Sequence, residues 1–470
     1  MVVAGLGHAR AGRPGAAHVS TTIAVIGGGS FYIAGVVRTL IRHGQNAAGL
    51  RVVLQDIDER RLDLMTRLSC NMVRAAAADM EIRSTPDPDE ALKGADFVLT
   101  CFRVGGLEAL KLDEDIPQAH GFYGEETAGP GGMFYALRTV PVVVDIARRM
   151  ERLCPEAFLV NYANPTAFVA DAVRRTTNIR EISLCDGFNF AYKAISAVLG
   201  VGRERILPFT AGVNHCTWLL RCYVDGRDAY PEFRRRVAAM ADDSAEFQKL
   251  LAIDKAAGGA PTEWKWQRAF EIMKLVGVLP VPGGHMLQYF FRDEEIRRQK
   301  QGLASSVFRT HDTEFEPVWK HFEKLAVAED PSFDMSIRGL HRYVGTVSDI
   351  AVSIILAILT DARRIFTLNL SNHGAIYNLP YGEIVEAPAV VGAFGAEHLS
   401  VGRLPEEVLP LTDALALNRK LIVDAALAGD RQTLLHALIQ NPLVDSAHRA
   451  AALMEEMLIT QAKWLPQFQQ

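Results

Sequence analysis

The sequence predicts an α/β protein: a Rossmann-type, doubly wound parallel sheet followed by a larger, mixed and mostly helical part. The first observation is that short apolar runs alternate with helix-length segments over residues 21–200, the rhythm of βαβ units. The second is a glycine turn, Gly27–Ser30, between the first apolar run and the first helix-length segment. The third is length: 470 residues exceed one small core, so about two domains are expected.

The elements follow in order along the chain. Buried-type strands are expected at 22–26, 51–55, 95–101 and 158–161, with helices at 34–43 and 59–78. From about residue 205 the pattern becomes mostly helical, with a strand-like piece at 218–224 and long helices at 405–428 and 447–465. Residues 1–20 are rich in Ala, Gly and Arg and are expected to be a disordered leader. We therefore predict a Rossmann domain over 21–204 and a catalytic and oligomerisation domain over 205–470.

Composition excludes several classes of protein. A net charge of -5 argues against a nucleic-acid-binding protein, which would show a basic excess. The chain has no run of 18 apolar residues, so we expect no membrane span. Its six cysteines are scattered, with no CxxC pair, which is typical of free thiols in a reducing cytoplasm.

The glycine turn is the first candidate binding site. A strand, a Gly-rich turn and a helix N-terminus together can hold a pyrophosphate, and the residues concerned are Gly27, Gly29, Ser30 and Phe31. Asp56 ends the next strand, where an acid would bind a ribose and disfavour a 2′-phosphate, so NAD is expected rather than NADP. Tyr32 replaces the third glycine of the usual motif. The alternative is a tight turn that binds no ligand.

Cys185 and His215 form the second candidate site. A thiolate and an imidazole can hold a divalent ion if water and substrate oxygens complete its coordination, and such an open shell is what a catalytic metal needs. The alternative is that both are ordinary core residues. Asn164 and Arg103 each follow a predicted strand, where side chains can face a ligand crevice; the alternatives are a simple turn and a solvated arginine.

Taken together, these segments resemble the NAD-dependent family 4 glycoside hydrolases. The resemblance covers nearly the whole chain after residue 20. It is carried by IAVIGGGSFY, LQDIDERRLDL, CFRVGGLEALKLDEDIPQAHGFYGEETAGPGGMFYALRTVP, LVNYANPTA, SLCDG, AGVNHCTW and NHGAIYNLPYGEIVEAPAVV followed by GRLP.

The resemblance implies a fold related to lactate and malate dehydrogenases, a bound NAD+ that is recycled, and a divalent ion, usually Mn2+, on Cys185 and His215. It implies that Arg103, Asp113 and Asn164 contact the sugar. The implied chemistry is transient oxidation at C3 of the sugar, removal of the C2 proton, elimination of the aglycone and addition of water. A cytoplasmic homodimer or homotetramer acting on a small glycoside is expected.

Two stretches depart from the family pattern. Glu125-Glu126-Thr127 stands where members usually read Gln-Glu-Thr, and 281–289 lacks the acid of the Ser-Ser-Glu-His type. His285 and Tyr289 remain there as acid/base candidates. Because 281–289 also lacks the Tyr-Leu-Arg-Tyr type of the phosphorylated-sugar branch, a non-phosphorylated glucuronide, galacturonide or galactoside is expected, with a 6-phospho-glycoside as the alternative. Two further alternatives are a 2-hydroxy-acid dehydrogenase and a sugar-binding protein that keeps NAD without catalysis.

Overall fold

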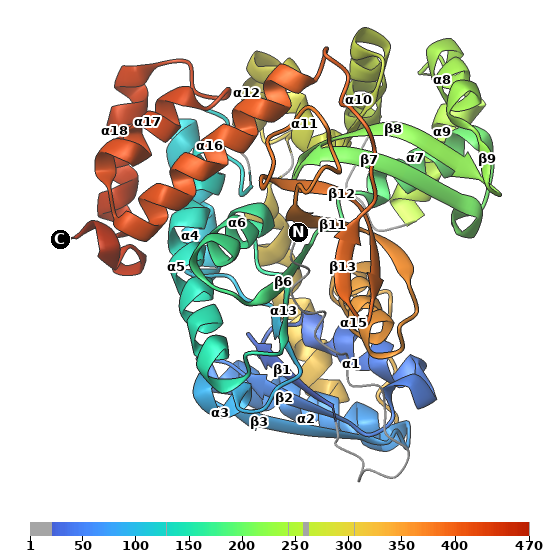
Figure 1. The fold of residues 1–470 in the computed structure, drawn as a ribbon, viewed down its shortest axis with the longest axis vertical. Helices are drawn as coiled ribbons and strands as arrows, with labels where there is room; N and C mark the ends of the chain where they lie inside the picture. The colour runs from blue at the N-terminus through green and yellow to red at the C-terminus, as the bar shows by residue number, and fades with distance from the viewer. Residues whose placement is uncertain (1–20, 128, 243, 257–262, 305, 470) are drawn as a thin grey trace, which may run out of the picture.

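The computed structural model describes residues 21–127, 129–242, 244–256, 263–304 and 306–469, so the leader expected at 1–20 lies outside the described residues. A single 13-stranded sheet runs through the described chain in the order β10-β8-β7-β12-β11-β6-β5-β4-β1-β2-β3, and its two remaining strands branch off, β13 beside β12 and β9 beside β8 (Figure 1). Strands β1 to β6 pair in parallel, in the order 3-2-1-4-5-6. This is the doubly wound Rossmann order, and it confirms the predicted fold class.

The parallel part follows the predicted rhythm closely. Its strands are β1 (Thr22–Ile26), β2 (Leu50–Gln55), β3 (Met80–Thr85), β4 (Phe97–Thr100), β5 (Phe158–Asn161) and β6 (Arg180–Leu184). Its helices are α1 (Tyr32–Arg42), α2 (Glu59–Ala75), α3 (Pro88–Leu92), α4 (Gly106–Ala119), α5 (Gly129–Leu153), α6 (Thr166–Thr176) and α7 (Asn189–Leu199).

Local sequence explains where these elements begin and end. Strand β1 is buried at every position, as expected for an apolar run covered by helices on both faces. Helix α2 begins after Asp58, whose carboxylate accepts a hydrogen bond from the backbone N–H of Arg61. It ends at Ala75, three residues before the predicted end, because the chain turns through Ala77 with a φ of 47°. The switch in strand order between β1 and β4 creates the crevice where ligands bind in such sheets.

The second half of the chain extends the same sheet with antiparallel strands. They are β7 (Ile206–Val213), β8 (Cys216–Val224), β9 (Arg227–Asp228), β10 (Leu279–Val281), β11 (Arg364–Ser371), β12 (Ile384–Gly392) and β13 (Gly395–His398). Strand β11 pairs with β6 and so continues the Rossmann sheet. Of these strands the sequence predicted only the one at 218–224. The others show little alternation of apolar and polar residues, and their apolar runs are short. The boundary predicted at 204/205 falls between α7 and β7.

Helices cover this half of the sheet. They are α8 (Tyr230–Ala239), α9 (Ala245–Ala256), α10 (Glu263–Val276), α11 (Gly283–Phe290), α12 (Arg292–Lys300), α13 (Val307–Leu325), α14 (Leu340–Tyr343), α15 (Thr346–Leu359), α16 (Leu409–Ala428), α17 (Arg431–Gln440) and α18 (Ala447–Thr460).

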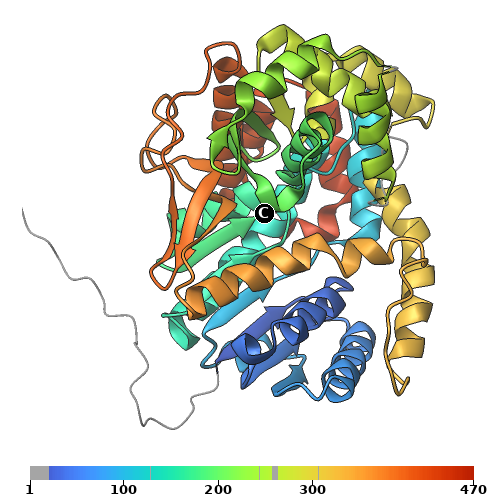
Figure 2. The same cartoon turned by 90° about the vertical axis from the view of Figure 1, so that its right-hand side faces the viewer.

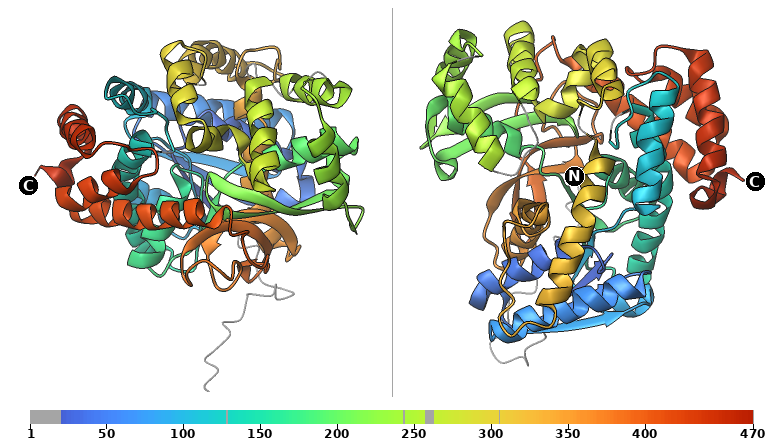
Figure 3. Two further views of the ribbon diagram at one scale, coloured as in Figure 1. Left: turned by 90° about the horizontal axis from the view of Figure 1, so that it is seen from above. Right: turned by 180° about the vertical axis from the view of Figure 1, so that it is seen from behind.

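Three of these contacts tie the two halves of the chain together. Helix α15 packs against α1 (Figure 2), and α13 reaches down to α2 (Figure 3). The C-terminal helices α16 to α18 pack around α5 and share one apolar core with it (Figure 1). Among the described residues, no helix is both long and apolar enough to cross a bilayer.

Candidate active site

The predicted dinucleotide turn lies between β1 and α1, at the switch in strand order. Gly27 has a φ of 93°, and a Cβ there would lie 2.4 Å from the carbonyl oxygen of Cys101, so only glycine fits. Asp56 accepts a hydrogen bond from the backbone N–H of Gly29 at 2.9 Å. The acid at the end of β2 therefore touches the glycine turn, as the prediction of a ribose-binding acid requires.

The side chain and the backbone N–H of Phe31 have different surroundings at this turn. Its ring is buried and stacks on Phe315 with ring centroids 5.2 Å apart, so the side chain belongs to the core. Its backbone N–H has no acceptor among the described residues, which is expected in the first turn of a helix. An anion at this helix N-terminus would therefore meet the main chain of Phe31 rather than its ring. The hydroxyl of Ser30 lies 3.4 Å from the Cys101 sulfur.

Arg103 follows β4, which lies beside β1, so it lies at the same edge of the sheet as the glycine turn. Its guanidinium forms an ion pair with Glu126 and lies 4.4 Å from the centroid of the Tyr135 ring. One of its terminal nitrogens, Nη1, is buried and has no hydrogen-bond partner among the described residues. Leaving a buried donor without a hydrogen bond costs free energy, and an oxygen of a bound ligand would supply the missing acceptor for this nitrogen.

Asp113 and Asn164 have different surroundings. Asp113 on α4 is fully buried, and its carboxylate accepts two hydrogen bonds from Arg138, at 2.9 and 2.5 Å. The predicted contact between Asp113 and substrate is therefore not favoured by this geometry. Asn164 follows β5 and is half-buried, with no side-chain hydrogen bond to the other described residues. Its amide group is available to a ligand, and the neighbouring Asn161 instead holds the strand ends together through Thr100.

Cys185 and His215, 30 residues apart in the chain, meet in the structure. Cys185 follows β6, and His215 lies in the β7–β8 turn with a φ of 61°, a conformation that is rare outside glycine. The Cys185 sulfur lies 3.6 Å from Nε2 of His215. A thiolate and an imidazole bound tetrahedrally to one ion would lie about 3.5–3.6 Å apart, given typical metal–ligand distances. The residues present therefore fit a divalent ion.

The protonation states of the pair also suit a metal. Burial and the neighbouring His285 lower the pKa of His215 to about 3, so the ring is neutral and its nitrogens can bind an ion. Burial raises the pKa of the Cys185 thiol, and the nearby carboxylates of Glu386 and Asp186 raise it further. A cation beside the sulfur reverses that effect and favours the thiolate.

A second group of side chains lies on the other side of the His215 ring. Nδ1 of His285 lies 2.6 Å from the Glu125 carboxylate, and the rings of His215 and His285 have centroids 4.3 Å apart. Glu125, His215 and His285 each offer one ligand atom, and these atoms lie within 4.8 Å of one another. Burial alone would raise the pKa of Glu125, but His285 and other donors lower it to about 2. The carboxylate is therefore ionised.

Glu386 on β12 approaches Cys185 from a third direction. It is buried, and its Oε2 accepts hydrogen bonds from the side-chain amides of Asn214, at 2.5 Å, and Asn369, at 3.1 Å. Its Oε1 has no partner among the described residues. Burial raises the pKa of Glu386, whereas Glu125 is ionised, so it is the charge of Glu125 that a divalent ion in the site would offset.

Tyr289 and His215 line the same small cavity. Thr127, Asn214, His215, Tyr289, Asn418 and Arg419 are among the residues that line it. Burial raises the pKa of Tyr289 well above its ordinary value. The two acid/base candidates from the sequence, Tyr289 and His285, thus lie on one helix, α11, beside His215.

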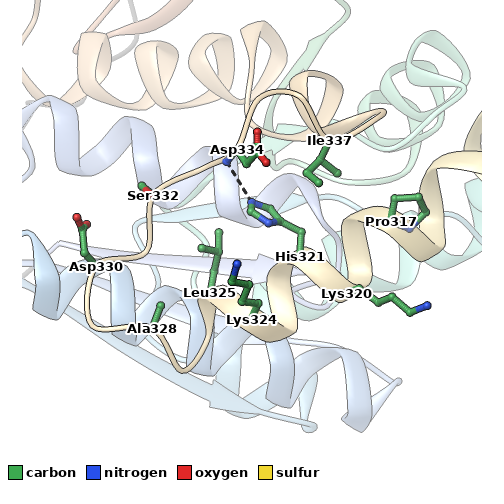
Figure 4. A pocket seen from close by; sticks show the side chains of 10 residues that line it. All are labelled: Pro317, Lys320, His321, Lys324, Leu325, Ala328, Asp330, Ser332, Asp334 and Ile337. Atoms are coloured by element: carbon green, nitrogen blue, oxygen red, sulfur yellow. Dashed lines mark hydrogen bonds between the residues drawn. The ribbon is translucent and has the colours of Figure 1, made fainter.

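A separate surface hollow lies away from this site. A cavity of about 610 Å³ opens between α13 and the loop that follows it (Figure 4). His321 accepts a hydrogen bond there from the backbone N–H of Asp334 at 3.3 Å. None of the predicted site residues lines this hollow. The candidate active site is therefore defined by its chemistry and not by the size of its opening.

Sequence reasoning missed three residues of the site: Glu125, Thr127 and Glu386. For Glu125 the signal was present, because it replaces a glutamine of the family pattern. No comparable signal marked Thr127 or Glu386 in the sequence.

A dehydrogenase-type sheet with a dinucleotide turn, next to a Cys/His pair with open coordination, defines a redox-assisted, metal-dependent enzyme. Comparison with known families agrees. The model of the family 4 glycosyl hydrolases matches residues 22–201, and the model of their C-terminal domain matches residues 210–444. The chain belongs to the family 4 glycosyl hydrolases and is an enzyme of that class, as the sequence predicted.

Three similar proteins place the chain within this family. A probable 6-phospho-beta-glucosidase of Bacillus subtilis (strain 168) is 34% identical over 451 residues, covering 95% of this chain and 97% of the relative. A 6-phospho-alpha-glucosidase from gut microorganisms, solved with NAD and glucose-6-phosphate, has a TM-score of 0.83 at 25% identity, covering 95% of this chain and 99% of that one. A 6-phospho-alpha-glucosidase from gut microorganisms that was solved with NAD and Mn2+ has a TM-score of 0.82 at 23% identity, covering 95% of this chain and 99% of that one.

The expected relation to dehydrogenases holds at the level of the fold. Lactate dehydrogenase from Eimeria maxima has a TM-score of 0.52 at 13% identity, covering 89% of this chain and 100% of that one. The fold alone does not make this chain a dehydrogenase.

Proposed function

We propose that this enzyme hydrolyses a 6-phospho-glycoside, with a 6-phospho-β-glucoside as its first candidate substrate, using NAD+ and a divalent ion, preferably Mn2+. The observation that carries the proposal is the 34% identity, over 95% of the chain, to a probable 6-phospho-beta-glucosidase. This reverses the preference for a non-phosphorylated glycoside drawn from the sequence. That preference depended on one short segment, 281–289, whereas the likeness extends over the whole chain.

The electrostatics of the site are compatible with a phosphorylated sugar. Arg342 and Lys193 lie close enough to the Asp186 carboxylate to interact with it electrostatically. Asp186 directly follows Cys185, so both cations lie near the predicted metal pair. A phosphate dianion bound beside them would be attracted by their positive charges.

Each part of the site has a proposed task. The N-terminus of α1, with Gly27, Gly29, Ser30 and Phe31, holds the NAD pyrophosphate, and Asp56 binds a ribose hydroxyl. Cys185 and His215 hold the ion. Arg103 and Asn164 orient the sugar through groups without other partners among the described residues. When bound, NAD+ supplies a hydride acceptor and the ion polarises a sugar oxygen.

One step remains for the side chains of this enzyme, the removal of the proton from C2 of the sugar. His285 is the better placed acceptor, because Glu125 holds its Nδ1 and leaves Nε2 for a substrate proton. Tyr289 would need its hydroxyl deprotonated, and burial opposes that. A cation in the site would act in the other direction, so Tyr289 stays the second candidate.

A substrate panel tests the proposal. The full-length enzyme is assayed with NAD+ and Mn2+ under reducing conditions on aryl 6-phospho-β-glucosides and 6-phospho-α-glucosides, and on the matching glycosides, glucuronides and galacturonides without phosphate. Turnover of a 6-phospho-glycoside, with no net release of NADH, is the expected result. Turnover confined to unphosphorylated sugars would overturn the substrate assignment. Net NADH production would identify a dehydrogenase, and tight NAD+ binding without any turnover would identify a binding protein.

The assembly and the location of the enzyme are also proposals. A cytoplasmic homodimer or homotetramer is expected, and light scattering of the purified protein measures the oligomeric state.

A further inference from the structure

Glu125 is the centre of a hydrogen-bond network that reaches two histidines. Its Oε2 accepts the backbone N–H of Thr127 at 2.9 Å, and its Oε1 lies 2.6 Å from Nδ1 of His285. The hydroxyl of Thr127 lies 3.0 Å from Oε1 and 2.7 Å from Nδ1 of His215. Glu125 and His215 do not bond directly in this network, so Thr127 is the link between them.

The direction of these hydrogen bonds fixes the tautomer of His215. A carboxylate only accepts hydrogen bonds, so the single hydroxyl hydrogen of Thr127 is drawn towards Glu125. The Thr127 oxygen is then the acceptor for His215, whose Nδ1 must carry the hydrogen. Nε2 is left with its lone pair, and Nε2 is the nitrogen that faces the Cys185 sulfur at 3.6 Å. This is the tautomer that can bind a metal beside Cys185.

We infer that Glu125 is a positioning residue for the metal site: through Thr127 it holds His215 in the tautomer that presents Nε2 to the ion. The inference rests on the metal part of the proposed function and deepens it. Metal-bound histidines usually donate their second N–H to an oxygen that orients the ring, and here that oxygen belongs to Thr127.

The residue type at position 125 matters for this role. The family pattern has glutamine here, and a glutamine offers one oxygen and one NH2 group. A glutamine whose oxygen accepts the Thr127 hydroxyl gives the same tautomer of His215, so the family's glutamine is compatible with a metal. In this chain His285 also donates to residue 125, and a glutamine has only one oxygen for the two donors. If that oxygen turns to His285, the NH2 group faces Thr127 and turns the hydroxyl hydrogen towards Nδ1 of His215, which leaves the hydrogen of His215 on Nε2.

Direct coordination is the competing arrangement. Glu125, His215 and His285 could hold an ion among themselves, because their ligand atoms lie within 4.8 Å. The hydrogen bonds described above argue against it, since Thr127 and His285 already occupy the Glu125 oxygens. The Cys185 sulfur also lies at the opposite nitrogen of the His215 ring.

Mn2+ binding to the full-length protein separates the two arrangements. Free Mn2+ is titrated by electron paramagnetic resonance in the wild type, Glu125→Gln, Thr127→Val and the double variant. If Glu125 acts through Thr127, each single variant binds Mn2+ about 10- to 100-fold more weakly. The double variant is then no weaker than the worse single variant, because both changes break the same link.

Matched controls keep the interpretation specific. Glu126→Gln removes the same charge one residue away, without a bond to Thr127, and should bind Mn2+ like the wild type. Thr127→Ser keeps the hydroxyl and should also keep the affinity. Thermal unfolding of each metal-free variant shows whether it is folded, and the Thr127→Ser and Thr127→Val pair remains informative if Glu125→Gln does not fold.

Three outcomes would overturn the inference. Weak binding by Glu125→Gln with normal binding by Thr127→Val would make Glu125 a direct ligand. Normal binding by both variants would leave Glu125 without a role at the metal. Failure of the wild type to bind Mn2+ would remove the site itself. Absence of glycosidase activity with the expected binding pattern would overturn the proposed function and leave this inference standing.

Discussion

Asp56 accepts a hydrogen bond from the backbone N–H of Gly29 at 2.9 Å, so the acid at the end of β2 and the glycine turn after β1 form one unit. The side chain is half-buried, at the end of the strand where such folds bind the adenosine ribose of a dinucleotide. A 2′-phosphate bound there would face a like charge. We therefore expect the acid that holds the turn also to select the cofactor.

The first prediction concerns that selection. NAD+ should bind at least about tenfold more tightly than NADP+, equivalent to about 1.4 kcal/mol. Asp56→Asn should reduce the difference in affinity between NAD+ and NADP+, because the amide removes the negative charge and keeps the shape of the side chain. Calorimetric titration of both cofactors measures the effect. Equal or tighter binding of NADP+ by the wild type would contradict the assigned role.

The second prediction concerns the metal. A chelator should abolish activity, and Mn2+ should restore it better than other divalent ions. Cys185→Ser should weaken Mn2+ binding by at least about tenfold, because a hydroxyl is a far poorer ligand than a thiolate. Cys222→Ser is the matched control, since Cys222 is a buried thiol outside the site. Full activity in protein freed of metal would exclude the Cys185 and His215 site.

The third prediction separates structure from substrate binding at Asp113. Its pairing with Arg138 is fully buried, so Asp113→Asn leaves an uncompensated charge in the core. The variant should lose about 3–5 kcal/mol of unfolding free energy. Urea denaturation measures the loss, and replacing Arg138 by Met in the same variant should recover part of it. A stable Asp113→Asn enzyme with a raised KM would instead assign Asp113 to the substrate, as the sequence suggested.

The fourth prediction is a pH effect on stability at Glu181, a half-buried residue of β6 that accepts a hydrogen bond from the Ser183 hydroxyl. Burial raises its pKa from 4.5 to about 8. Because the folded pKa lies above the unfolded one, the stabilising contribution is complete below pH 4.5 and is lost as the pH rises to about 8. The melting temperature of Glu181→Gln, compared with that of the wild type at the same pH, should therefore be higher at pH 8 than at pH 5. If the difference in melting temperature between the two proteins is the same at both pH values, the assigned pKa shift of Glu181 is wrong.

The sequence predicted the elements that depend on residues close together in the chain, and it missed contacts between residues that are far apart in the chain. The glycine turn, its strand and its helix are neighbours in the chain, so their pattern is visible in a line of sequence. The contact between Glu125 and His285 joins residues 160 positions apart, and that between Asn214 and Glu386 joins residues 172 apart. The second contact depends on the pairing of β12 with β7, which local periodicity does not specify.

The same reasoning explains the two departures from the family pattern. Read separately, Glu125 and the 281–289 segment were two irregularities. In the structure they are one contact, the carboxylate against Nδ1 of His285. The histidine that remains in 281–289 therefore contacts the acid that replaces the family's glutamine, and the two place a pair of titratable groups beside His215.

The last prediction concerns the base that removes the C2 proton. If elimination is the route, turnover in D2O should place deuterium at C2 of the released sugar, provided that the base exchanges with solvent. His285, whose ring is 30% exposed, can exchange more readily than the buried hydroxyl of Tyr289. His285→Gln should lower kcat by about 10²- to 10⁴-fold, the usual contribution of a general base, and leave NAD+ binding intact.

Tyr289→Phe is the matched variant on the same helix and should retain most of the activity if His285 is the base. Product analysis by NMR and rates with C2-deuterated substrate check the assignment together. Confirmed turnover with protium only at C2, no isotope effect and normal rates in His285→Gln would exclude His285. Normal rates in Tyr289→Phe alone would exclude Tyr289 and leave the hydride and metal steps untouched.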